Sequence, residues 1–470
     1  MSQGSPLEHF SYDANGRLCA RGRPMSEIAR VCGTPTYVYD ADAIRSRYHE
    51  LTEAFASIGP EVRFAAKACG NLSVLRDLVG LGAGVDVVSG GEVERAWTAG
   101  CPMERVCFAG VGKTDDEIRA ALDGRYSPLA AGFDGMDPVR RGPIGLFNVE
   151  SADELSRIDS IARELGVTAR CALRVKPLVD AKTHDYTSTG RLADKFGVDL
   201  EDAPELFARF GRVEDIAGAR LIGLHAHIGS PVNTTEPFVK SARVLVDLAA
   251  SLRERGRLIE LINLGGGWGT AYQTGEAPDL RVYAEAVAPV LADELTRGTR
   301  ILIEPGRTLV ANAGVLLLSV TAVKRTGGRR FVVLDAGMNA LIRPSLYGAF
   351  HFAWPIEVSA SDVPRAASQD AGIPGRFEPA DLVGPICESG DFLARERPFP
   401  EVRPGDVVAV LSAGAYGMSM SSNYNDHAQP AEVLLDGGRV IRARRRESIG
   451  DLLQPEAEAI ELRCEVTEDE

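Results

Sequence analysis

Eight short apolar runs, separated by turns and amphipathic segments, dominate the chain between residues 61 and 307. Each run is followed by a polar or glycine-rich turn and then, in most cases, by a segment whose apolar positions recur three and four residues apart, which is typical of a half-buried helix. The runs begin at residues 62, 85, 106, 144, 169, 221, 258 and 300. Eight strands that alternate with helices over about 250 residues predict a (β/α)8 barrel.

The pattern changes after Arg307. The stretches GVLLLSVTAVKR, RRFVVLDAG, DVVAVLSAGAYG and AEVLLDGGRVIRARR predict strands separated by Gly, Pro and Asp turns, with little helix between them. CGTPTYVYD, at 32–40, is also strand-like. We therefore expect a barrel over 41–308 and a mostly β domain made of 1–40 and 309–470. Residues 125–143 exceed an ordinary connection in length and are interpreted as an insertion.

The composition restricts the partners and the compartment. A net charge of -14 and a pI near 5.2 argue against the basic face that nucleic acids and anionic membranes require. The eight cysteines form no CxxC pair, which indicates reduced thiols. The N-terminus MSQGSPLEHF lacks a basic-then-apolar leader, and no stretch is apolar enough to span a bilayer. We expect a cytoplasmic protein with a small-molecule partner, and neither a nucleic-acid nor a membrane partner.

Reactive groups in a barrel of this kind lie at the carboxyl ends of the strands. The first run ends in FAAKACGN, so Lys67 is expected at the barrel mouth. A lone lysine is usually a solvated charge, but a lysine on the interior side of an apolar strand loses solvation. This loss should lower its pKa and free the amine to form a Schiff base.

The last three runs end in residues that suit a flat, phosphorylated cofactor. HAHIGS supplies His225, His227 and Ser230, and one histidine can pack on a ring while the other fills the core. The three glycines of LGGGWG let backbone N–H groups approach an anion where barrels commonly hold phosphate. Glu304, in IEPGR, is costly to bury unless it is paired, and a protonated ring nitrogen is a suitable partner. Together with Lys67, these groups predict a site for pyridoxal phosphate.

The chain resembles one enzyme family along nearly its whole length. The matching stretches are FAAKACGN, GVDVVSGGE, FAGVGKT, LFNVES, DAKTHDYTSTGRLADKFG, HAHIGSP, LGGGWG, EPGR, DAGMNALIRPSLYGAFH, CESGD and GAYG. Through them it resembles the diaminopimelate decarboxylases, pyridoxal-phosphate enzymes with an alanine-racemase-like barrel and β domain. The resemblance implies decarboxylation of the D-centre of meso-2,6-diaminopimelate to L-lysine, the last step of lysine synthesis.

The resemblance also implies which residues bind the cofactor. Lys67 would carry it covalently, His227 would lie over the ring face, and Glu304 would meet the ring nitrogen. The full implied set at the cofactor is Lys67, His227, Ser230, Gly266, Gly267, Glu304, Gly306, Arg307 and Tyr416, with Ser230, Gly266 and Gly267 at the phosphate.

A second implied set binds the substrate. Arg307, Arg343 and Tyr347 would hold its distal carboxylate. Glu388 would meet its distal ammonium group, and Tyr416 would lie at both phosphate and substrate. Such a division suits the chemistry, because a carboxylate needs arginine and an ammonium group needs a carboxylate.

Cys387 lies in PICESGD, between an apolar dipeptide and two acids. From the residues alone it could be a nucleophile, a metal ligand, a proton donor or core filler. PICESGD lacks the further Cys or His of a metal site, and Glu388 and Asp391 argue against burial in an apolar core. The resemblance implies that Cys387 donates a proton to Cα after decarboxylation, in the active site of the neighbouring subunit. The protein is then expected to be a homodimer with shared sites and no catalytic metal.

Four positions depart from the pattern of the family. Phe64 stands where Tyr is usual, Cys69 where Asn is usual, and Lys176 and Leu178 where Asn and Gly are commoner. These positions touch neighbours of the cofactor rather than the implied catalytic groups, so they bear on substrate tuning and leave the reaction class unchanged.

Two other functions compete with this interpretation. One is a related decarboxylase that acts on ornithine, arginine, carboxynorspermidine or a carrier-bound amino acid; relatives that act on plain diamines resemble a pattern with Asp in place of Glu388. The other is a non-catalytic homologue, which need not keep Lys67 and Cys387.

Overall fold

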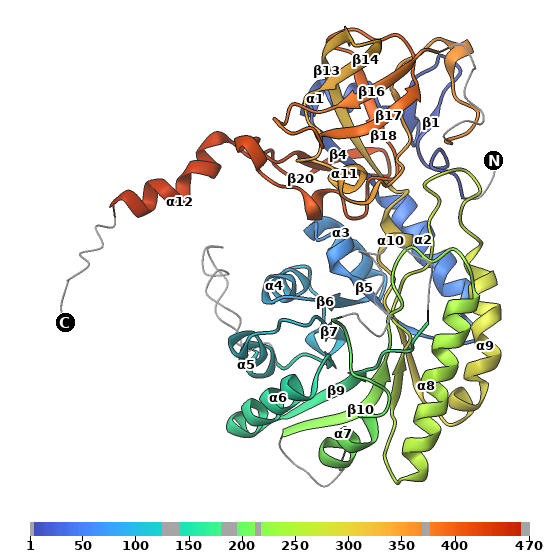
Figure 1. Cartoon of the computed structure of the whole chain (residues 1–470), viewed down its shortest axis with the longest axis vertical. Coiled ribbons are helices and arrows are strands. Elements are labelled where there is room, and N and C mark those ends of the chain that lie inside the picture. The colour runs from blue at the N-terminus through green and yellow to red at the C-terminus, as the bar shows by residue number, and fades with distance from the viewer. Residues whose placement is uncertain (1–3, 125–141, 180–194, 212–217, 369–376, 462–470) are drawn as a thin grey trace.

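The computed structural model describes residues 4–124, 142–179, 195–211, 218–368 and 377–461. A β-rich part lies at one end of the molecule and a barrel surrounded by helices at the other (Figure 1). The interpreted insertion at 125–143 lies almost entirely outside the described residues.

The eight apolar runs form the eight strands of one closed barrel, which confirms the predicted fold class. All neighbouring strands pair in parallel, and β12 closes the barrel against β5. The strands are β5 (Glu61–Ala65), β6 (Gly84–Val87), β7 (Val106–Phe108), β8 (Leu146–Val149), β9 (Thr168–Arg174), β10 (Gly218–His225), β11 (Leu261–Asn263) and β12 (Arg300–Ile303).

Alternation along these strands separates two cores. Side chains that point inward form a small buried cluster within the barrel, made of Cys107, Leu146, Ala172, Ile222, Leu261 and Leu302. Their neighbours in sequence point outward and belong to the larger core beneath the helices. The interior is therefore filled below the mouth, and reactive groups can gather only at the strand ends.

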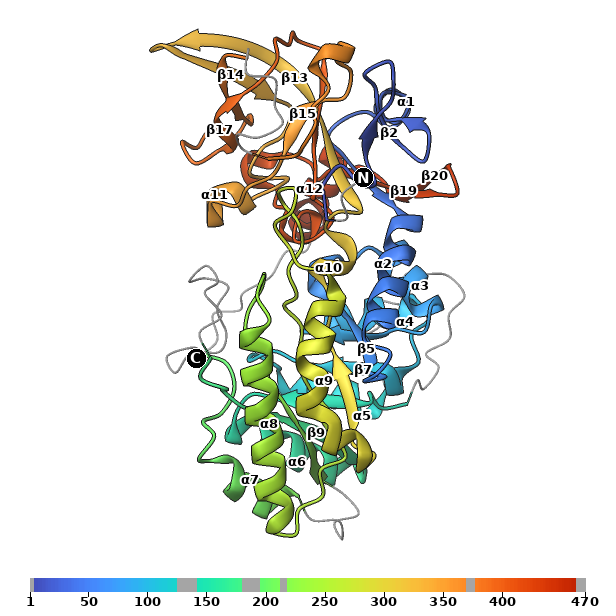
Figure 2. The ribbon, with the colours of Figure 1, turned by 90° about the vertical axis from the view of Figure 1, so that its right-hand side faces the viewer.

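A helix follows each barrel strand. The helices are α3 (Leu72–Gly80), α4 (Gly90–Thr98), α5 (Asp115–Asp123), α6 (Ala152–Leu165), α7 (Ala203–Phe210), α8 (Glu236–Glu254), α9 (Leu280–Thr296) and the short α10 (Arg307–Val310), and α2 (Ala41–Ala54) precedes the barrel. Side-chain caps begin several of them: Asn71 for α3, Ser89 for α4, and Thr114 with Glu117 as a capping box for α5. Figure 2 shows α8 and α9 running side by side along the barrel wall.

The second part of the fold is a sheet in the order β17-β16-β14-β13-β4-β19-β20, to which β18 and β15 are added through β13. Its strands are β4 (Thr36–Asp40), β13 (Gly314–Thr326), β14 (Arg329–Leu334), β15 (Ala353–Pro355), β16 (Pro379–Val383), β17 (Phe392–Pro398), β18 (Val407–Val410), β19 (Ala431–Asp436) and β20 (Arg439–Arg444). The strand from before the barrel, β4, lies between β13 and β19. The boundaries at 40/41 and 308/309 stay a prediction.

Smaller elements complete this part. They are β1 (Ser11–Tyr12), β2 (Leu18–Ala20), β3 (Arg23–Pro24), α1 (Met25–Cys32), α11 (Arg343–Tyr347) and α12 (Ile449–Glu461). Helix α12 extends away from the sheet (Figure 1). Among the described residues, no helix has the length and apolar character of a membrane span.

Candidate active site

A pocket lies where the barrel strands end. Its lining residues are Ala65, Lys67, His227, Ser230, Gly267, Trp268, Glu304, Gly306, Arg307, Thr308 and Tyr416. Eight of these eleven are residues that the sequence places at a cofactor. They come from the ends of β5, β10, β11 and β12 and from the loop after β18, so distant segments converge on one site.

Glu304 is buried beneath this pocket and has the partners that its charge requires. Its Oε1 accepts hydrogen bonds from Asn148 Nδ2 at 2.8 Å and from Asn263 Nδ2 at 2.6 Å. His225 Nε2 lies 3.3 Å from Oε2. Burial alone would raise the pKa of Glu304, but His225, Lys67 and the Asn263 amide together hold it below its usual value. The carboxylate therefore stays ionised at the floor of the pocket.

Lys67 lies in a single 3-10 turn, Ala66–Ala68, directly after β5. The expectation that the pKa of Lys67 would fall is wrong. Burial does act in that direction, but the charges of Asp86, Tyr416 and Glu304 outweigh it and raise the pKa of Lys67. Asp86 Oδ2 lies 3.6 Å from the Lys67 ammonium nitrogen. Lys67 is thus a charged ammonium group next to Asp86, whose own pKa is raised by burial.

His227 is held against the glycine turn by the backbone. Its Nδ1 accepts a hydrogen bond from the Gly266 N–H at 3.1 Å. Burial, and next the nearby charge of Lys67, lower the pKa of His227 well below its usual value. The ring is therefore neutral, and it lines the pocket.

The turn at Gly266 and Gly267 leaves no room for a side chain. A Cβ on Gly266 would lie 2.0 Å from the carbonyl oxygen of Glu304, and one on Gly267 would lie 2.2 Å from that of Gly229. The backbone segments can approach this closely only because both residues are glycine. The turn therefore forms a cradle at which the backbone of Gly267, a pocket-lining residue, can approach an anion closely, while the Gly266 N–H is engaged by His227.

Replacing Gly266 by alanine is expected to destabilise the protein by about 1–3 kcal/mol and to weaken cofactor binding, because the Cβ overlaps the backbone of the Glu304 strand. Urea unfolding and dialysis of the cofactor measure the two effects. Gly112→Ala is the matched control, since a Cβ there meets nothing within 4 Å. Equal stability of the two variants would contradict the close approach.

Two buried arginines, Arg307 and Arg343, both contact Tyr272 beside the pocket. Arg307 donates to the Tyr272 hydroxyl at 2.7 Å and to Ser230 Oγ at 3.0 Å. The Arg343 guanidinium lies 4.6 Å from the centre of the Tyr272 ring. In the described part of the chain, neither arginine forms an ion pair with a carboxylate. Buried guanidinium groups without a carboxylate partner favour an anionic ligand.

The pKa of His351 is lowered by burial and by its cationic neighbour Arg343. Its Nε2 lies 2.8 Å from Arg343 Nη1, and its Nδ1 lies 3.0 Å from the Leu411 carbonyl oxygen. Burial, and next the charge of Arg343, lower the pKa of His351 to about 3. The neutral ring can then accept from Arg343 through Nε2 while Nδ1–H donates to Leu411.

Cys387 and Glu388 are not part of the pocket lining of their own chain. Both are exposed, in the loop between β16 and β17. The Cys387 N–H donates to Asn425 Oδ1 at 2.8 Å. Asp391 is itself buried, and its carboxylate accepts from the Ile386 and Met338 N–H groups, which shapes the loop. Cys387 is thus outside any apolar core, as expected, and Asp391 orders the loop from within.

The comparisons with known proteins agree on one family. Residues 41–311 match the model of the pyridoxal-dependent decarboxylase, pyridoxal binding domain. A diaminopimelate decarboxylase of Pseudomonas aeruginosa is 42% identical over 453 residues, which cover 96% of this chain and 99% of the relative. The chain belongs to the diaminopimelate decarboxylases. It is accordingly an enzyme, and its cofactor is pyridoxal phosphate.

Solved structures show the same relationship. The Helicobacter pylori diaminopimelate decarboxylase complexed with L-lysine aligns with a TM-score of 0.79 and 35% identity, covering 93% of this chain and all of that chain (100%). The M. jannaschii diaminopimelate decarboxylase in co-complex with L-lysine aligns with a TM-score of 0.82 and 34% identity, covering 96% and 98%.

The pocket fits pyridoxal phosphate. A primary amine, a buried ionised carboxylate, a neutral imidazole and a glycine cradle all face one space. A phosphate would lie at the cradle, and a cationic ring nitrogen would lie at Glu304. Tyr416 completes the rim; its left-handed backbone (φ 55°) accompanies a hydrogen bond from its N–H to the Ala68 carbonyl, which ties the β domain to the turn of Lys67.

Three buried groups could in principle hold a metal ion instead, because ligand atoms of Asp86, Cys107 and Glu304 lie within 4.8 Å of one another. Thiolate is the form of cysteine that binds metals, but burial raises the pKa of the Cys107 thiol. Glu304 Oε1 already accepts two amide hydrogen bonds. The chemistry of the set therefore favours a carboxylate that serves the cofactor.

Several residues that surround the site were not predicted from the sequence. Asp86, Asn148 and Asn263 each stand within or at the end of an apolar strand, and a polar residue at such a place was the available signal. Tyr272 carried no signal, since nothing local to AYQTG indicates that two arginines meet there.

The four departures lie around rather than in the pocket lining. Phe64 and Cys69 are buried in the main core, and burial raises the pKa of the Cys69 thiol to about 12. Lys176 pairs with Asp199 at 3.2 Å. Leu178 is exposed, with a left-handed backbone (φ 55°). None of these four residues lines the pocket.

Proposed function

We propose that this enzyme removes CO2 from meso-2,6-diaminopimelate and releases L-lysine, the final step of lysine synthesis. The observation that carries the choice of substrate is the pair of buried guanidinium groups, Arg307 and Arg343, which have no carboxylate partner in the described chain and lie beside the pocket of Lys67. An amino acid with a second carboxylate supplies the missing anion, whereas ornithine and lysine do not.

The proposed chemistry assigns a task to each side chain. Lys67 would hold the aldehyde carbon of the cofactor, Ser230 with Gly266 and Gly267 its phosphate, and Glu304 its ring nitrogen. When bound, pyridoxal phosphate withdraws the electron pair left at Cα as CO2 departs. His227 would pack on one face of the ring and exclude water from it, and the lowered pKa of His227 keeps the imidazole neutral.

A proton must then reach Cα. The Cα–carboxylate bond has broken with its electron pair remaining on the substrate side, so one proton from a nearby acid completes the product. Cys387 is the proposed donor: its thiol hydrogen passes to Cα, and the thiolate takes a proton from solvent afterwards. Since Cys387 is exposed and does not line the pocket of its own chain, we assign it to the site of a second subunit.

The proposed assembly is a homodimer whose two sites each combine residues of both chains. Glu388 adjoins Cys387 and is also exposed. It would enter the same partner site and bind the distal ammonium group of the substrate. Tyr347 and Tyr416 would complete the substrate contacts. The seven described cysteines are free, and together with the acidic charge this supports a cytoplasmic location.

Glu388→Gln and Arg343→Gln are expected to reduce selectivity for diaminopimelate over lysine. Leaving one charge of a desolvated pair unmatched costs several kcal/mol, so kcat/KM on diaminopimelate should fall by about two or more orders of magnitude for Glu388→Gln. Steady-state kinetics on both substrates measure the change. Glu396→Gln, an exposed acid of β17, is the control. Unchanged selectivity in both site variants would place substrate recognition elsewhere.

One assay tests the function directly. The purified protein is incubated with pyridoxal phosphate and meso-diaminopimelate, ornithine, arginine or lysine, and the released CO2 and the amine products are identified. Production of L-lysine from diaminopimelate alone is the expected result. Turnover of a plain diamino acid with equal efficiency would move the protein to a related decarboxylase.

A further inference from the structure

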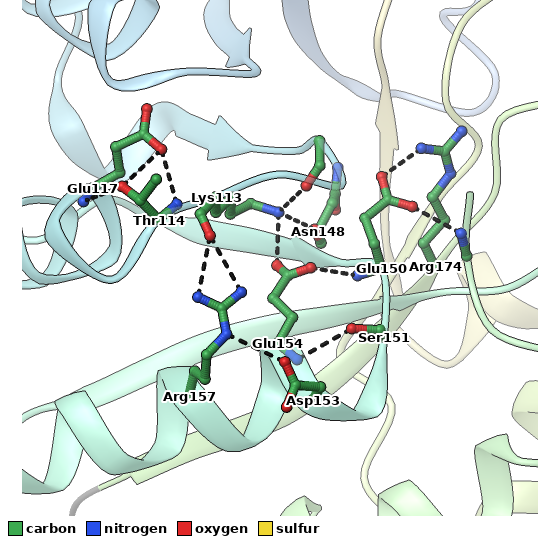
Figure 3. A network of polar contacts seen from close by, with 12 residues as sticks. Lys113, Thr114, Glu117, Asn148, Glu150, Ser151, Asp153, Glu154, Arg157 and Arg174 are labelled. Carbon is green, nitrogen blue, oxygen red and sulfur yellow. Dashed lines mark hydrogen bonds and ion pairs between the residues drawn. The ribbon is translucent and has the colours of Figure 1, made fainter. Parts of the chain in front are cut away.

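Lys113 is a fully buried cation at the carboxyl ends of two barrel strands. Its ammonium nitrogen lies 2.8 Å from the Gly110 carbonyl oxygen, 3.0 Å from the Asn148 carbonyl oxygen and 2.7 Å from Glu154 Oε1. Its side chain is 0% exposed and that of Glu154 is 4% exposed. Figure 3 shows the three contacts converging on the one nitrogen. Three acceptors match the three donors of an ammonium group.

The contacts join the two strand ends that reach Glu304. Gly110 follows β7, and this strand carries Cys107, whose Sγ lies 4.0 Å from Glu304 Oε1. Asn148 belongs to β8, and its amide donates to the same Oε1. Lys113 holds the backbone carbonyl of Asn148 while the side chain of Asn148 holds the carboxylate. One buried ammonium group is therefore two hydrogen bonds away from the floor of the cofactor pocket.

A second group of contacts, made by Glu154 and Glu150, holds Lys113 in place. Glu154 Oε2 accepts from the Glu150 N–H at 3.0 Å, and the Glu150 carboxylate pairs with Arg174 at 2.5 Å and accepts from the Gly197 N–H at 2.8 Å (Figure 3). The chain of contacts thus runs from α6 through the end of β8 to the end of β9. Lys113 cannot move without breaking it.

We propose that Lys113 is a positioning residue for the cofactor: it clamps the ends of β7 and β8 so that Asn148 holds the Glu304 carboxylate in place for the ring nitrogen. The inference rests on the proposed role of Glu304. An ammonium group suits the task because its donors spread in three directions, whereas the donors of the planar guanidinium group of arginine lie in one plane.

The main variant is the double substitution Lys113→Met with Glu154→Gln. Removing Lys113 alone would leave Glu154 buried without its partner, so both charges are removed together. The dissociation constant of pyridoxal phosphate from the holoprotein is expected to rise about tenfold, as loss of support for a charge-assisted hydrogen bond implies. The pH dependence of the visible absorption of the bound cofactor should move by about one pH unit, which corresponds to the same factor.

The matched control is Arg253→Met with Glu294→Gln. This pair is also a close ion pair, at 2.6 Å with Glu294 2% exposed, but it links α8 and α9 near the amino ends of β11 and β12. It should lower the resistance to urea without changing cofactor affinity or absorption. If the Lys113 pair behaves like this control, the network only stabilises the fold and the proposal is overturned.

Two further variants make the result decisive. Lys113→Arg retains the charge for Glu154 and should fold even where the double variant does not; wild-type affinity and absorption in Lys113→Arg would contradict the proposal. Asn148→Ala should reproduce the loss of affinity, and adding the Lys113 pair to it should cause no further loss, because both act through one route. Losses that multiply would show independent effects and overturn the clamp.

Glu304→Gln separates the inference from the function on which it rests. If this variant binds pyridoxal phosphate with unchanged affinity and absorption, the proposed role of Glu304 fails. If Glu304→Gln changes both properties and the Lys113 variants change neither, only the positioning role of Lys113 fails.

Discussion

Replacing Lys67 by alanine should remove the covalent link to the cofactor and lower turnover by about three orders of magnitude or more. Lys67 is the lysine that lines the pocket above Glu304, and its ammonium group lies 3.6 Å from Asp86. Among the residues that the structure describes, no other lysine lines that pocket. The remaining groups can still bind pyridoxal phosphate by its phosphate and ring, so noncovalent binding should survive at reduced affinity.

Borohydride provides the measurement, since it reduces a protein–cofactor imine to a stable amine bond. The wild-type protein should retain the pyridoxyl group after denaturation, and Lys67→Ala should not. Lys240→Ala, on the exposed surface of α8, is the control and should behave as the wild type. A stable pyridoxyl link in Lys67→Ala would show that another amine carries the cofactor.

Mixing two inactive variants, Lys67→Ala and Cys387→Ala, should restore activity. In a two-fold dimer with shared sites, a mixed dimer holds one site in which Lys67 of one chain and Cys387 of the other are both intact. Random exchange makes half of the dimers mixed, each with one intact site of two, so recovery should approach roughly a quarter of the wild-type activity. The exposure of Cys387, outside the pocket lining of its own chain, is the reason to expect this result.

The control for this experiment is a mixture of Lys67→Ala and Glu304→Gln. Both residues line the same pocket of one chain, so every mixed dimer has two damaged sites. This mixture should stay inactive under conditions of demonstrated subunit exchange. Absence of recovery with Cys387→Ala as well would show that Cys387 serves its own chain or has no catalytic task.

Much of the fold could be predicted because its signals are local. The eight apolar runs became the eight strands, and the capping residues Asn71, Ser89 and Thr114 begin the helices that follow three of them. Strand alternation and helix caps depend on neighbours within a few residues, so a single sequence contains them.

The site was predictable where a residue stands at a strand end. Lys67, His227, Gly267 and Glu304 all line the pocket, because the carboxyl ends of parallel strands in a closed barrel must meet. The charge states of the site residues could not be predicted in this way. The sequence-based expectation for Lys67 had the wrong sign, since the pKa depends on Asp86, a residue of the next strand.

The sequence by itself determined the succession of strands and helices, the family, and the strand-end residues that line the pocket, because these depend on local patterns and short motifs. Only the tertiary structure decided what surrounds those residues: two asparagines and a histidine on Glu304, a tyrosine between Arg307 and Arg343, and the solvent exposure of Cys387. Charge states and hydrogen bonds at the site arise between side chains far apart in sequence, so they exist only once the barrel has closed.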